Sequence, residues 1–348
     1  MIKKLTLNLV FLILAFLNAT SQDPDSKTDW WGDIDGYINQ QDKVTLSLVN
    51  EALRIYPPSI EESLSRKMAL VLIDNVMHEE KAPFRPAVQE FFHSRIAGAI
   101  KEIKSTKVEK GAMIWKMYDH TWIVKTASVT MAFDLQRGIP RIPEFITGKD
   151  KMKELINVVD ILFISHFHGD HADSWVAEQF IDQNKPVITP PGVFESLPIY
   201  AKIDHPERIA LKVQSIKLPG KDLKLSVVIN PGHQSEKILN NVYIVTTPEG
   251  LTFSHTGDQS YEPDFEWIDK IGDNFKVDVL FVNSWYFQTG FRTGTGFRPK
   301  LIIPGHENEL GHTIDHREPF WLNNNRLGNR DSQPWFNMAW GEKYYFVR

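Results

Sequence analysis

The sequence contains no cysteine among its 348 residues. Disulfide bonds are therefore excluded, and so are the thiolate ligands that many structural zinc sites use. Any metal ion that this chain binds must be held by histidine, aspartate, glutamate and water. That ligand set suits Zn²⁺, and suits Mn²⁺ or Fe²⁺ less well.

The sequence also lacks a concentrated basic region. Its 39 lysines and arginines are scattered among 44 aspartates and glutamates, and the formal net charge is -5. A protein that binds nucleic acid usually has a basic stripe that neutralises phosphates. A nucleic-acid partner is therefore not expected, although a secreted nuclease is unsupported rather than excluded. A small-molecule substrate is expected instead, and the sequence does not determine the oligomeric state.

Long apolar runs are scarce, and the one that stands out lies at the N-terminus. Lys3 and Lys4 precede the apolar run Leu9–Leu17, and the small residues Ala19–Ser21 follow it. The run is shorter than the roughly 20 apolar residues of a membrane span, so a transmembrane anchor is the weaker interpretation. We predict a cleaved signal peptide over residues 1–21, a secreted or periplasmic protein, and no stable membrane span after cleavage.

Residues 22–110 carry helical patterns. Pro57-Pro58-Ser59 is typical of a helix start, and apolar residues follow at helical spacing as far as Met77. A second helix is expected from Pro86 to Ile103, with its apolar residues on one side. We interpret this region as a helical extension that packs onto a larger domain; a lid or a dimer surface is the alternative.

Short strand-like segments separated by helical ones fill residues 111–348. This alternation predicts an α/β fold, either two sheets with helices outside or a layered α/β domain. The C-terminal aromatic residues are expected to close the core as a last strand. The expected strands are Trp122–Val124, Val129–Phe133, Val158–Ser165, Pro186–Ile188, Leu225–Ile229, Val242–Val245, Gly250–Phe253, Val277–Val282 and Leu301–Pro304.

The most specific local pattern is His166-Phe167-His168-Gly169-Asp170-His171, directly after the strand-like segment that ends at Ser165. In an extended backbone, residues i and i+2 point the same way, so His166 and His168 can reach one cation. Gly169 lets the chain turn, which would bring Asp170 and His171 toward a second cation. The spacing therefore predicts two metal ions at the carboxyl end of a strand.

Three further candidates each lie just past a strand-like segment, where functional loops are common. They are His233 after Asn230-Pro231-Gly232, Asp258 after Gly257, and His306 after Pro304-Gly305. They follow His171 at successive intervals of 62, 25 and 48 residues. Turn-forming residues precede all three, so each side chain is expected at a tight turn.

This order of residues resembles the metallo-β-lactamase-fold hydrolase superfamily over about residues 111–315. The resemblance implies a four-layer αββα sandwich, with the helical extension outside it, and a metal-dependent hydrolase with a hydroxide between two Zn²⁺ ions. Asp134 matches an early structural aspartate and is expected to accept hydrogen bonds beneath the site. The implied metal ligands are His166, His168 and His233 for the first ion, Asp170, His171 and His306 for the second, and Asp258 as the bridge.

Within that superfamily, true β-lactamases generally lack the bridging aspartate. A chain with Asp258 and His306 therefore looks more like the lactonase, phosphodiesterase and thioester-hydrolase branches. The RNA-processing branch usually carries a large insert before its last histidine, and only 48 residues separate these two ligands. The resemblance thus implies cleavage of an ester, a lactone or a phosphodiester.

Other residues are candidates for substrate contacts and catalysis. Asp170 is expected to orient the hydroxide, and His312 to act as an acid or electrophile, while His316 is interpreted as solvated. His255 stays open between a site role and a structural one. Trp285-Tyr286-Phe287 could line the pocket or the core. Residues 288–298 read as a mobile loop, whose Arg292 and Arg298 could alternatively grip a carboxylate or phosphate.

Two other classes of function compete with this reading. One is an iron-containing redox protein or dioxygenase on the same fold. The other is a non-catalytic binding protein, for which a broken ligand set is expected. The ligand set in this sequence is intact.

Overall fold

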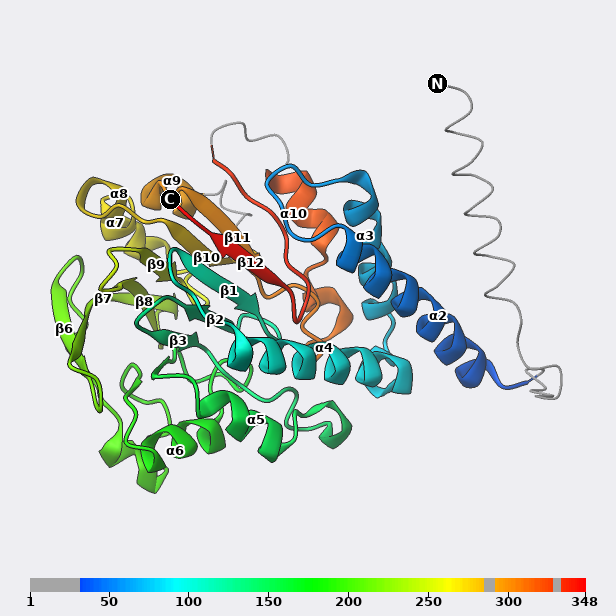
Figure 1. Cartoon of the computed structure of the whole chain (residues 1–348), viewed down its shortest axis with the longest axis horizontal. Coiled ribbons are helices and arrows are strands. Elements are labelled where there is room, and N and C mark those ends of the chain that lie inside the picture. The colour runs from blue at the N-terminus through cyan, green and yellow to red at the C-terminus, as the bar shows by residue number, and fades with distance from the viewer. Residues whose placement is uncertain (1–31, 285–291, 328–332) are drawn as a thin grey trace. The chain divides into compact units, whose positions relative to one another are not determined.

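The computed structural model describes residues 32–284, 292–327 and 333–348. Residues 42–348 form one compact unit, and its elements are labelled in Figure 1. The predicted signal peptide and Trp285-Tyr286-Phe287 lie outside the described residues. The helices are α2 (Ile34–Ile55), α3 (Leu64–Met77), α4 (Pro86–Ser105), α5 (Lys149–Ile156), α6 (Ser174–Asp182), α7 (Phe265–Ile268), α8 (Ile271–Asn274), α9 (Arg292–Phe297) and α10 (Phe320–Leu327).

The described strands form two six-stranded sheets. The first has the order β12 (Lys343–Phe346), β1 (Ala112–Lys116), β2 (Trp122–Lys125), β3 (Thr130–Phe133), β4 (Ile161–Phe163), β5 (Val187–Ile188). The second has the order β11 (Leu301–Gly305), β10 (Val279–Asn283), β9 (Thr252–His255), β8 (Ile238–Thr246), β7 (Leu223–Ser235), β6 (Val213–Leu218). Every predicted strand is present, and the expected C-terminal strand is β12, which pairs with β1.

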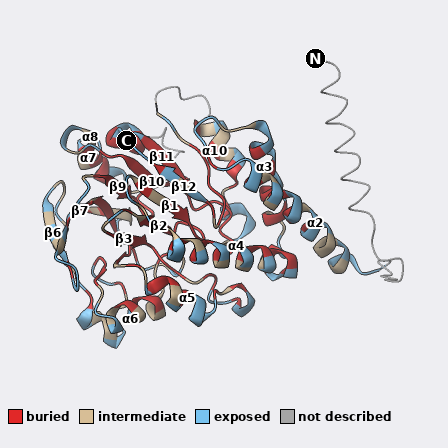
Figure 2. Ribbon diagram, in the orientation of Figure 1, coloured by how far each residue is buried: buried red, intermediate tan, exposed pale blue. Residues whose placement is uncertain are grey.

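Three apolar layers hold the sheets and helices together. The middle layer fills the space between the sheets, with Phe133 and Phe163 from the first sheet and Phe253 and Phe281 from the second. A second layer packs α3, α4, α5 and α6 on the first sheet, and a third packs α7 to α10 on the other. Figure 2 shows buried strands between helices that each have one buried and one exposed face. The predicted αββα sandwich is confirmed.

The helices of the predicted extension share an apolar layer with the first sheet. Phe92 on α4 stacks on Phe145 at a ring distance of 4.2 Å, and Leu70 on α3 is fully buried in the same layer. The buried guanidinium of Arg66 on α3 donates to both carboxylate oxygens of Glu342, next to β12. Helices α3 and α4 are therefore packed parts of the layer outside the first sheet, while a domain boundary at residue 110 stays a prediction.

The structure differs from the sequence prediction in three segments. Helix α3 begins at Leu64, where the Ser63 side chain accepts the backbone N–H of Arg66, and not at Pro57-Pro58-Ser59. Residues 292–297 form helix α9 rather than a mobile loop, because the chain packs closely there: a Cβ added at Gly296 would lie 2.7 Å from the carbonyl oxygen of Ile268. Strand β7 extends through His233 to Ser235, because it continues as a hairpin with β8. In the described part of the chain, no helix has the length and apolar character needed to cross a membrane.

Candidate metal centre

The sheet topology brings the predicted ligands to one edge of the sandwich. Strands β9, β10 and β11 run parallel, so their carboxyl ends lie at the same edge. Asp258 follows β9 and His306 follows β11 at that edge. The histidine-rich loop that follows β4 meets them there, because Asn241 on β8 donates its backbone N–H to the carbonyl of Ser165.

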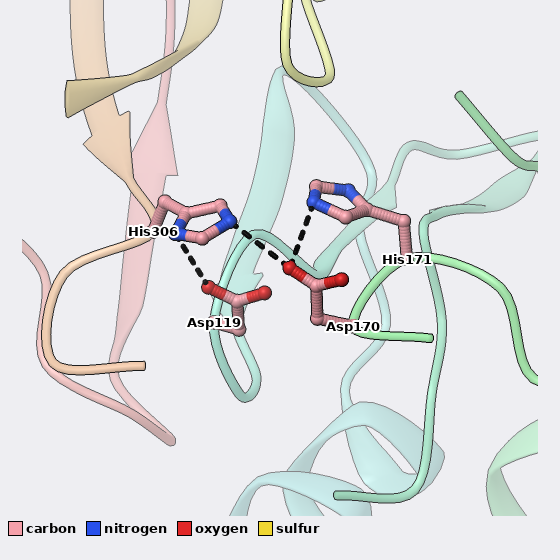
Figure 3. A group of neighbouring side chains, drawn as sticks. All are labelled: Asp119, Asp170, His171 and His306. Atoms are coloured by element: carbon pink, nitrogen blue, oxygen red, sulfur yellow. Dashed lines mark hydrogen bonds and ion pairs between the residues drawn. The ribbon is translucent and has the colours of Figure 1, made fainter. Parts of the chain in front are cut away.

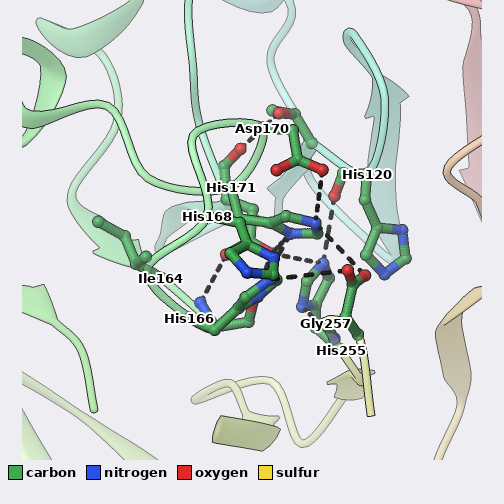
Figure 4. A network of polar contacts seen from close by, with 12 residues as sticks. His120, Ile164, His166, His168, Asp170, His171, His255 and Gly257 are labelled. Carbon is green, nitrogen blue, oxygen red and sulfur yellow. Dashed lines mark hydrogen bonds and ion pairs between the residues drawn. The ribbon is translucent and has the colours of Figure 1, made fainter. Parts of the chain in front are cut away.

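One group of possible ligands contains His166, His168 and Asp258, whose ligand atoms all lie within 4.8 Å of one another. His166 Nε2 lies 3.0 Å from His168 Nδ1 and 3.6 Å from Asp258 Oδ2. Figure 4 shows these rings converging on one point. The i, i+2 geometry expected from the sequence therefore holds for the two histidines.

A second group lies beside the first and contains Asp170, His171, His306 and Asp119. Asp170 Oδ2 lies 3.4 Å from His171 Nε2 and 3.2 Å from His306 Nε2 (Figure 3). The first three residues are those implied for one ion by the sequence resemblance. Asp119, in the turn between β1 and β2, was not predicted.

Asp258 lies between the two groups. Its Oδ2 faces His166, while its Oδ1 lies 3.3 Å from His171 Nε2 and 3.8 Å from His306 Nε2. Asn283 Nδ2 donates to the same Oδ1 at 2.5 Å. One carboxylate oxygen is therefore turned toward each group, which is the arrangement that a bridging ligand requires.

His171 is oriented by Asp134. Its Nδ1 lies 2.7 Å from Asp134 Oδ2, and the same carboxylate accepts hydrogen bonds from the backbone N–H and the hydroxyl of Ser165. His171 Nε2 is buried and has no hydrogen-bond partner in the described residues. Because Asp134 holds Nδ1, Nε2 is the ring nitrogen that faces the site. Asp134 lies beneath the site, as the sequence predicted.

His306 has a similar carboxylate behind it. Asp119 Oδ1 lies 3.4 Å from His306 Nδ1, while His306 Nε2 faces Asp170 (Figure 3). Asp119 is fully buried, and neither of its oxygens accepts a hydrogen bond within the described residues. Its φ of +56° lies in the left-handed region, which aspartate tolerates better than most residues. An acidic residue in a tight turn between strands was the signal available in the sequence.

His233 belongs to neither group of possible ligands in the described residues. Its Nδ1 lies 3.1 Å from Asp264 Oδ2, and its backbone N–H donates to Gln259 Oε1. Gln259 Nε2 also donates to Asp264. His233 thus resembles His171 and His306 in having a carboxylate next to Nδ1. Its Nε2 is the nitrogen left to bind a metal ion. Asp264 was not identified from the sequence.

The charge of the centre is strongly unbalanced without a cation. Asp119, Asp134 and Asp258 are buried, and Asp170 lies with them. Burial opposes ionisation of Asp258, but the charges of His171 and His306 hold the pKa of that carboxyl well below its usual value. Several buried carboxylates around histidine rings form a donor set that fits divalent cations and, without them, is costly to bury.

The two groups differ in how they titrate. Burial lowers the pKa of His166 to about 3, so this ring is neutral, which is the form that binds a metal. Burial would lower the pKa of His306 as well, but Asp119 and Asp258 raise it to about 10. The carboxylates around His306 thus favour its protonated form, whereas His166 is neutral.

His312 lies at the rim of the second group. Its ring stacks on His306 at 5.4 Å, its Nε2 lies 3.9 Å from Asp170 Oδ2, and its Nδ1 lies 3.7 Å from Glu309 Oε2. His316 is exposed and pairs with Thr313 and Asp315, as predicted for a solvated residue. The structure therefore brings His312 to the site and leaves His316 outside it.

His255 has both ring nitrogens occupied within the protein. Its Nδ1 accepts the backbone N–H of Gly257, and its Nε2 lies 3.2 Å from the carbonyl oxygen of His120 (Figure 4). Neither His255 nor His120 belongs to the two groups of possible ligands in the described part of the chain. The structural interpretation of His255 is therefore favoured.

The two arginines considered for substrate binding point elsewhere. Arg292 pairs with Glu262 and Asp269, and Arg298 pairs with Asp273. These ion pairs lie on the surface around α7, α8 and α9. Neither arginine belongs to the residues around the metal groups.

The fold resembles solved structures of metal-dependent hydrolases. A metallo hydrolase from the hyperthermophilic archaeon Ignicoccus hospitalis matches with a TM-score of 0.54 and 17% identity, over 69% of this chain and 100% of that one. An isothiocyanate hydrolase from Delia radicum gut bacteria matches with a TM-score of 0.51 and 13% identity, over 68% of this chain and 100% of that one. No protein-family model and no curated protein sequence matches the chain.

The αββα sandwich, with histidines and aspartates gathered at one edge, defines the fold class of this chain. The chain has the metallo-β-lactamase fold, as its sequence pattern implied. At these identities the similarity establishes the fold, and the activity has to be argued from the residues of the site.

Proposed function

We propose that this chain is a secreted or periplasmic dinuclear zinc hydrolase that cleaves an ester, lactone or phosphodiester bond of a small molecule. The observation that carries the proposal is the position of Asp258, with one oxygen facing each group of ligands. The proposed ligands are His166, His168 and His233 for one ion, Asp170, His171 and His306 for the other, and Asp258 for both. Export rests on the N-terminal sequence pattern alone.

Two divalent ions would supply a water molecule of lowered pKa and positive charge for developing negative charge on the substrate. The side chains have separate tasks around them. Asp134 and Asp119 lie at Nδ1 of His171 and His306, whose Nε2 atoms face the centre, and Asp264 lies at Nδ1 of His233. Asp170 accepts a hydrogen bond from the attacking water and so orients it. His312, at the open rim, donates a proton to the leaving oxygen.

Replacing Asp258 by alanine tests the dinuclear centre. We expect Asp258→Ala to lose about one of two bound ions, because the remaining histidines cannot bridge the groups, and to lose most turnover. Metal content is measured by elemental analysis of purified protein, alongside activity on the best substrate from a generic panel of esters, lactones, thioesters and phosphodiesters.

Asp315→Ala is a matched control, because Asp315 is an exposed acid that follows His312 by three residues in the sequence and belongs to neither ligand group in the described residues. It should keep both ions and full turnover. Full metal content and full activity in Asp258→Ala would overturn the bridging role. Metal-loaded wild-type protein that is inactive on every substrate of the panel would count against hydrolysis and favour a binding protein.

A further inference from the structure

A cavity of about 260 Å³ opens directly beside the second group of ligands. Three loops form its wall, and they come from distant parts of the sequence. The first follows β3, the second is the histidine-rich loop after β4, and the third follows β11. The lining includes Gly138 and Arg141 from the first loop, Asp170 from the second, and Glu309, Gly311 and His312 from the third.

The acidic residues of this wall are already engaged. Glu309 Oε1 accepts the hydroxyl of Tyr118 at 2.9 Å, and Oε2 accepts the backbone N–H of His312 at 2.6 Å. Asp170 faces the rings of His171 and His306. Both carboxylates are therefore directed at donors in the protein, and neither neutralises a charge across the cavity.

Arg141 is the cation of this wall. Its Nη2 donates to the carbonyl oxygen of Gly311, so the side chain reaches from the first loop to the third. The described residues provide no carboxylate within ion-pair distance of Arg141. Burial lowers the pKa of the neighbouring Arg317, and the charge of Arg141 lowers it further. A guanidinium has five N–H donors, and most of those of Arg141 are left for a ligand.

The loop that carries Arg141 is held in place by its own backbone. Ile139 N–H donates to the carbonyl of Phe145, and Phe145 N–H donates to the carbonyl of Ile142. Gly138 has a φ of +133°, and a Cβ there would lie 2.1 Å from the carbonyl oxygen of Phe145, so only glycine fits. The guanidinium is thus presented from a fixed turn, which reduces the entropy lost on binding.

We propose that Arg141 binds a carboxylate or phosphate group of the substrate in this cavity, while the bond to be cleaved lies next to Asp170 and His312. A guanidinium binds both oxyanions with two parallel hydrogen bonds. The cavity volume limits the substrate to a small molecule. This inference rests on the proposed hydrolytic function, because it assigns the substrate class for the same site.

Three matched esters test the proposal. They are 4-nitrophenyl esters of the same chain length that end in a carboxylate, in a phosphate, or in the methyl ester of that carboxylate. Wild-type protein, loaded with zinc, should hydrolyse at least one of the anionic esters about tenfold or more faster in kcat/KM than the neutral ester. Arg141→Ala should remove that preference, because it should raise KM for the anionic ester by a larger factor than it changes kcat/KM for the neutral ester. Arg141→Lys should restore part of it.

Arg54→Ala is the matched control, because Arg54 is an exposed arginine of α2 that pairs with Glu51. Arg54→Ala should leave kcat/KM for all three esters unchanged. Equal hydrolysis of the charged and neutral esters by wild-type protein would overturn the inference and leave hydrolysis standing. If none of the esters is cleaved, the proposed function fails for esters. Calorimetry with adipate then tests the anion site alone: binding that depends on Arg141 supports it, and binding equal in Arg141→Ala overturns it.

Discussion

Three of the five predicted histidine ligands share one arrangement at the level of single residues. His171, His233 and His306 each direct Nδ1 at a carboxylate, from Asp134, Asp264 and Asp119 respectively. Such a carboxylate fixes the tautomer and the direction of the ring, and it makes Nε2 a better ligand. The distances of 2.7, 3.1 and 3.4 Å rank Asp119 as the most loosely paired of the three.

Asp119→Asn should weaken binding of the ion held by His306. An amide has no charge to stabilise the Nδ1–H of His306, and the loss of a carboxylate partner typically costs 10- to 100-fold, so we expect roughly that loss in metal affinity. Chelator competition on purified protein measures it. Asp150→Asn, an exposed acid on α5, should leave the affinity unchanged. An unaltered affinity in Asp119→Asn would show that His306 needs no help from this carboxylate.

At the level of elements, helix α3 holds the loop that carries His306 and His312. Asp74 accepts hydrogen bonds from the side chain of Asn308 and from the backbone N–H groups of Phe320 and Trp321. Lys116 on β1 pairs with the buried Glu307, next to His306. Helix α3 and strand β1 therefore fix both sides of this loop, which gives the N-terminal helices a direct connection to the site.

Asp74 should make stability depend on pH. Burial raises the pKa of this carboxyl from 3.8 to about 6, against the lowering effect of its hydrogen bonds. The folded state therefore binds the proton more tightly than the unfolded state, and the stabilisation is full below about pH 4 and is lost as pH rises through 6. Between pH 5 and 8 the free energy of unfolding should fall by about 1 kcal/mol from this group.

Urea unfolding of zinc-loaded wild-type protein and of Asp74→Asn checks this expectation. The amide does not titrate, so the difference in stability between the two proteins should change by about 1 kcal/mol across that range. Glu102→Gln, at a partly exposed position on α4, should follow the wild-type curve. A difference that stays constant with pH would show that Asp74 is ionised throughout.

At the level of the whole molecule, the proposed metal centre lies between the two sheets. Its proposed ligands come from the loop after β4 in the first sheet and from β7 or the loops after β9 and β11 in the second. Asp119, Asp134, Asp170 and Asp258 gather where these segments meet. Bound cations would neutralise these carboxylates only in the folded state, so metal binding should stabilise the entire sandwich.

Removing the metal should therefore lower the melting temperature. We expect a decrease of about 10 °C after chelation, corresponding to a few kcal/mol of binding free energy. Calorimetry of metal-loaded and chelated protein measures it, and Zn²⁺ should restore the original value. The absorption spectrum of the protein as isolated separates zinc, which is colourless, from the iron of a redox protein. An identical melting temperature with and without metal would argue against a centre that spans both sheets.

Much of the fold was predictable because strands and helices have local patterns. The strand-like segments all became strands, and α3 and α4 lie where apolar spacing predicted helices. Helix α9 was missed because Gly294 and Gly296 resemble a loop in sequence. In the structure Gly296 packs against the carbonyl oxygen of Ile268, where a Cβ would lie only 2.7 Å away, so this position of the helix needs glycine.

The sequence by itself determined the pair His166 and His168, the turn at Gly169, and the order of the remaining ligands. These features depend on backbone geometry over a few residues, and they identify the fold. Only the tertiary structure placed Asp119 behind His306, Asp264 behind His233, and Arg141 across the cavity from Gly311. Such pairs are far apart in the chain, and no local spacing encodes them. They arise only when the two sheets pack and bring their loops to one edge.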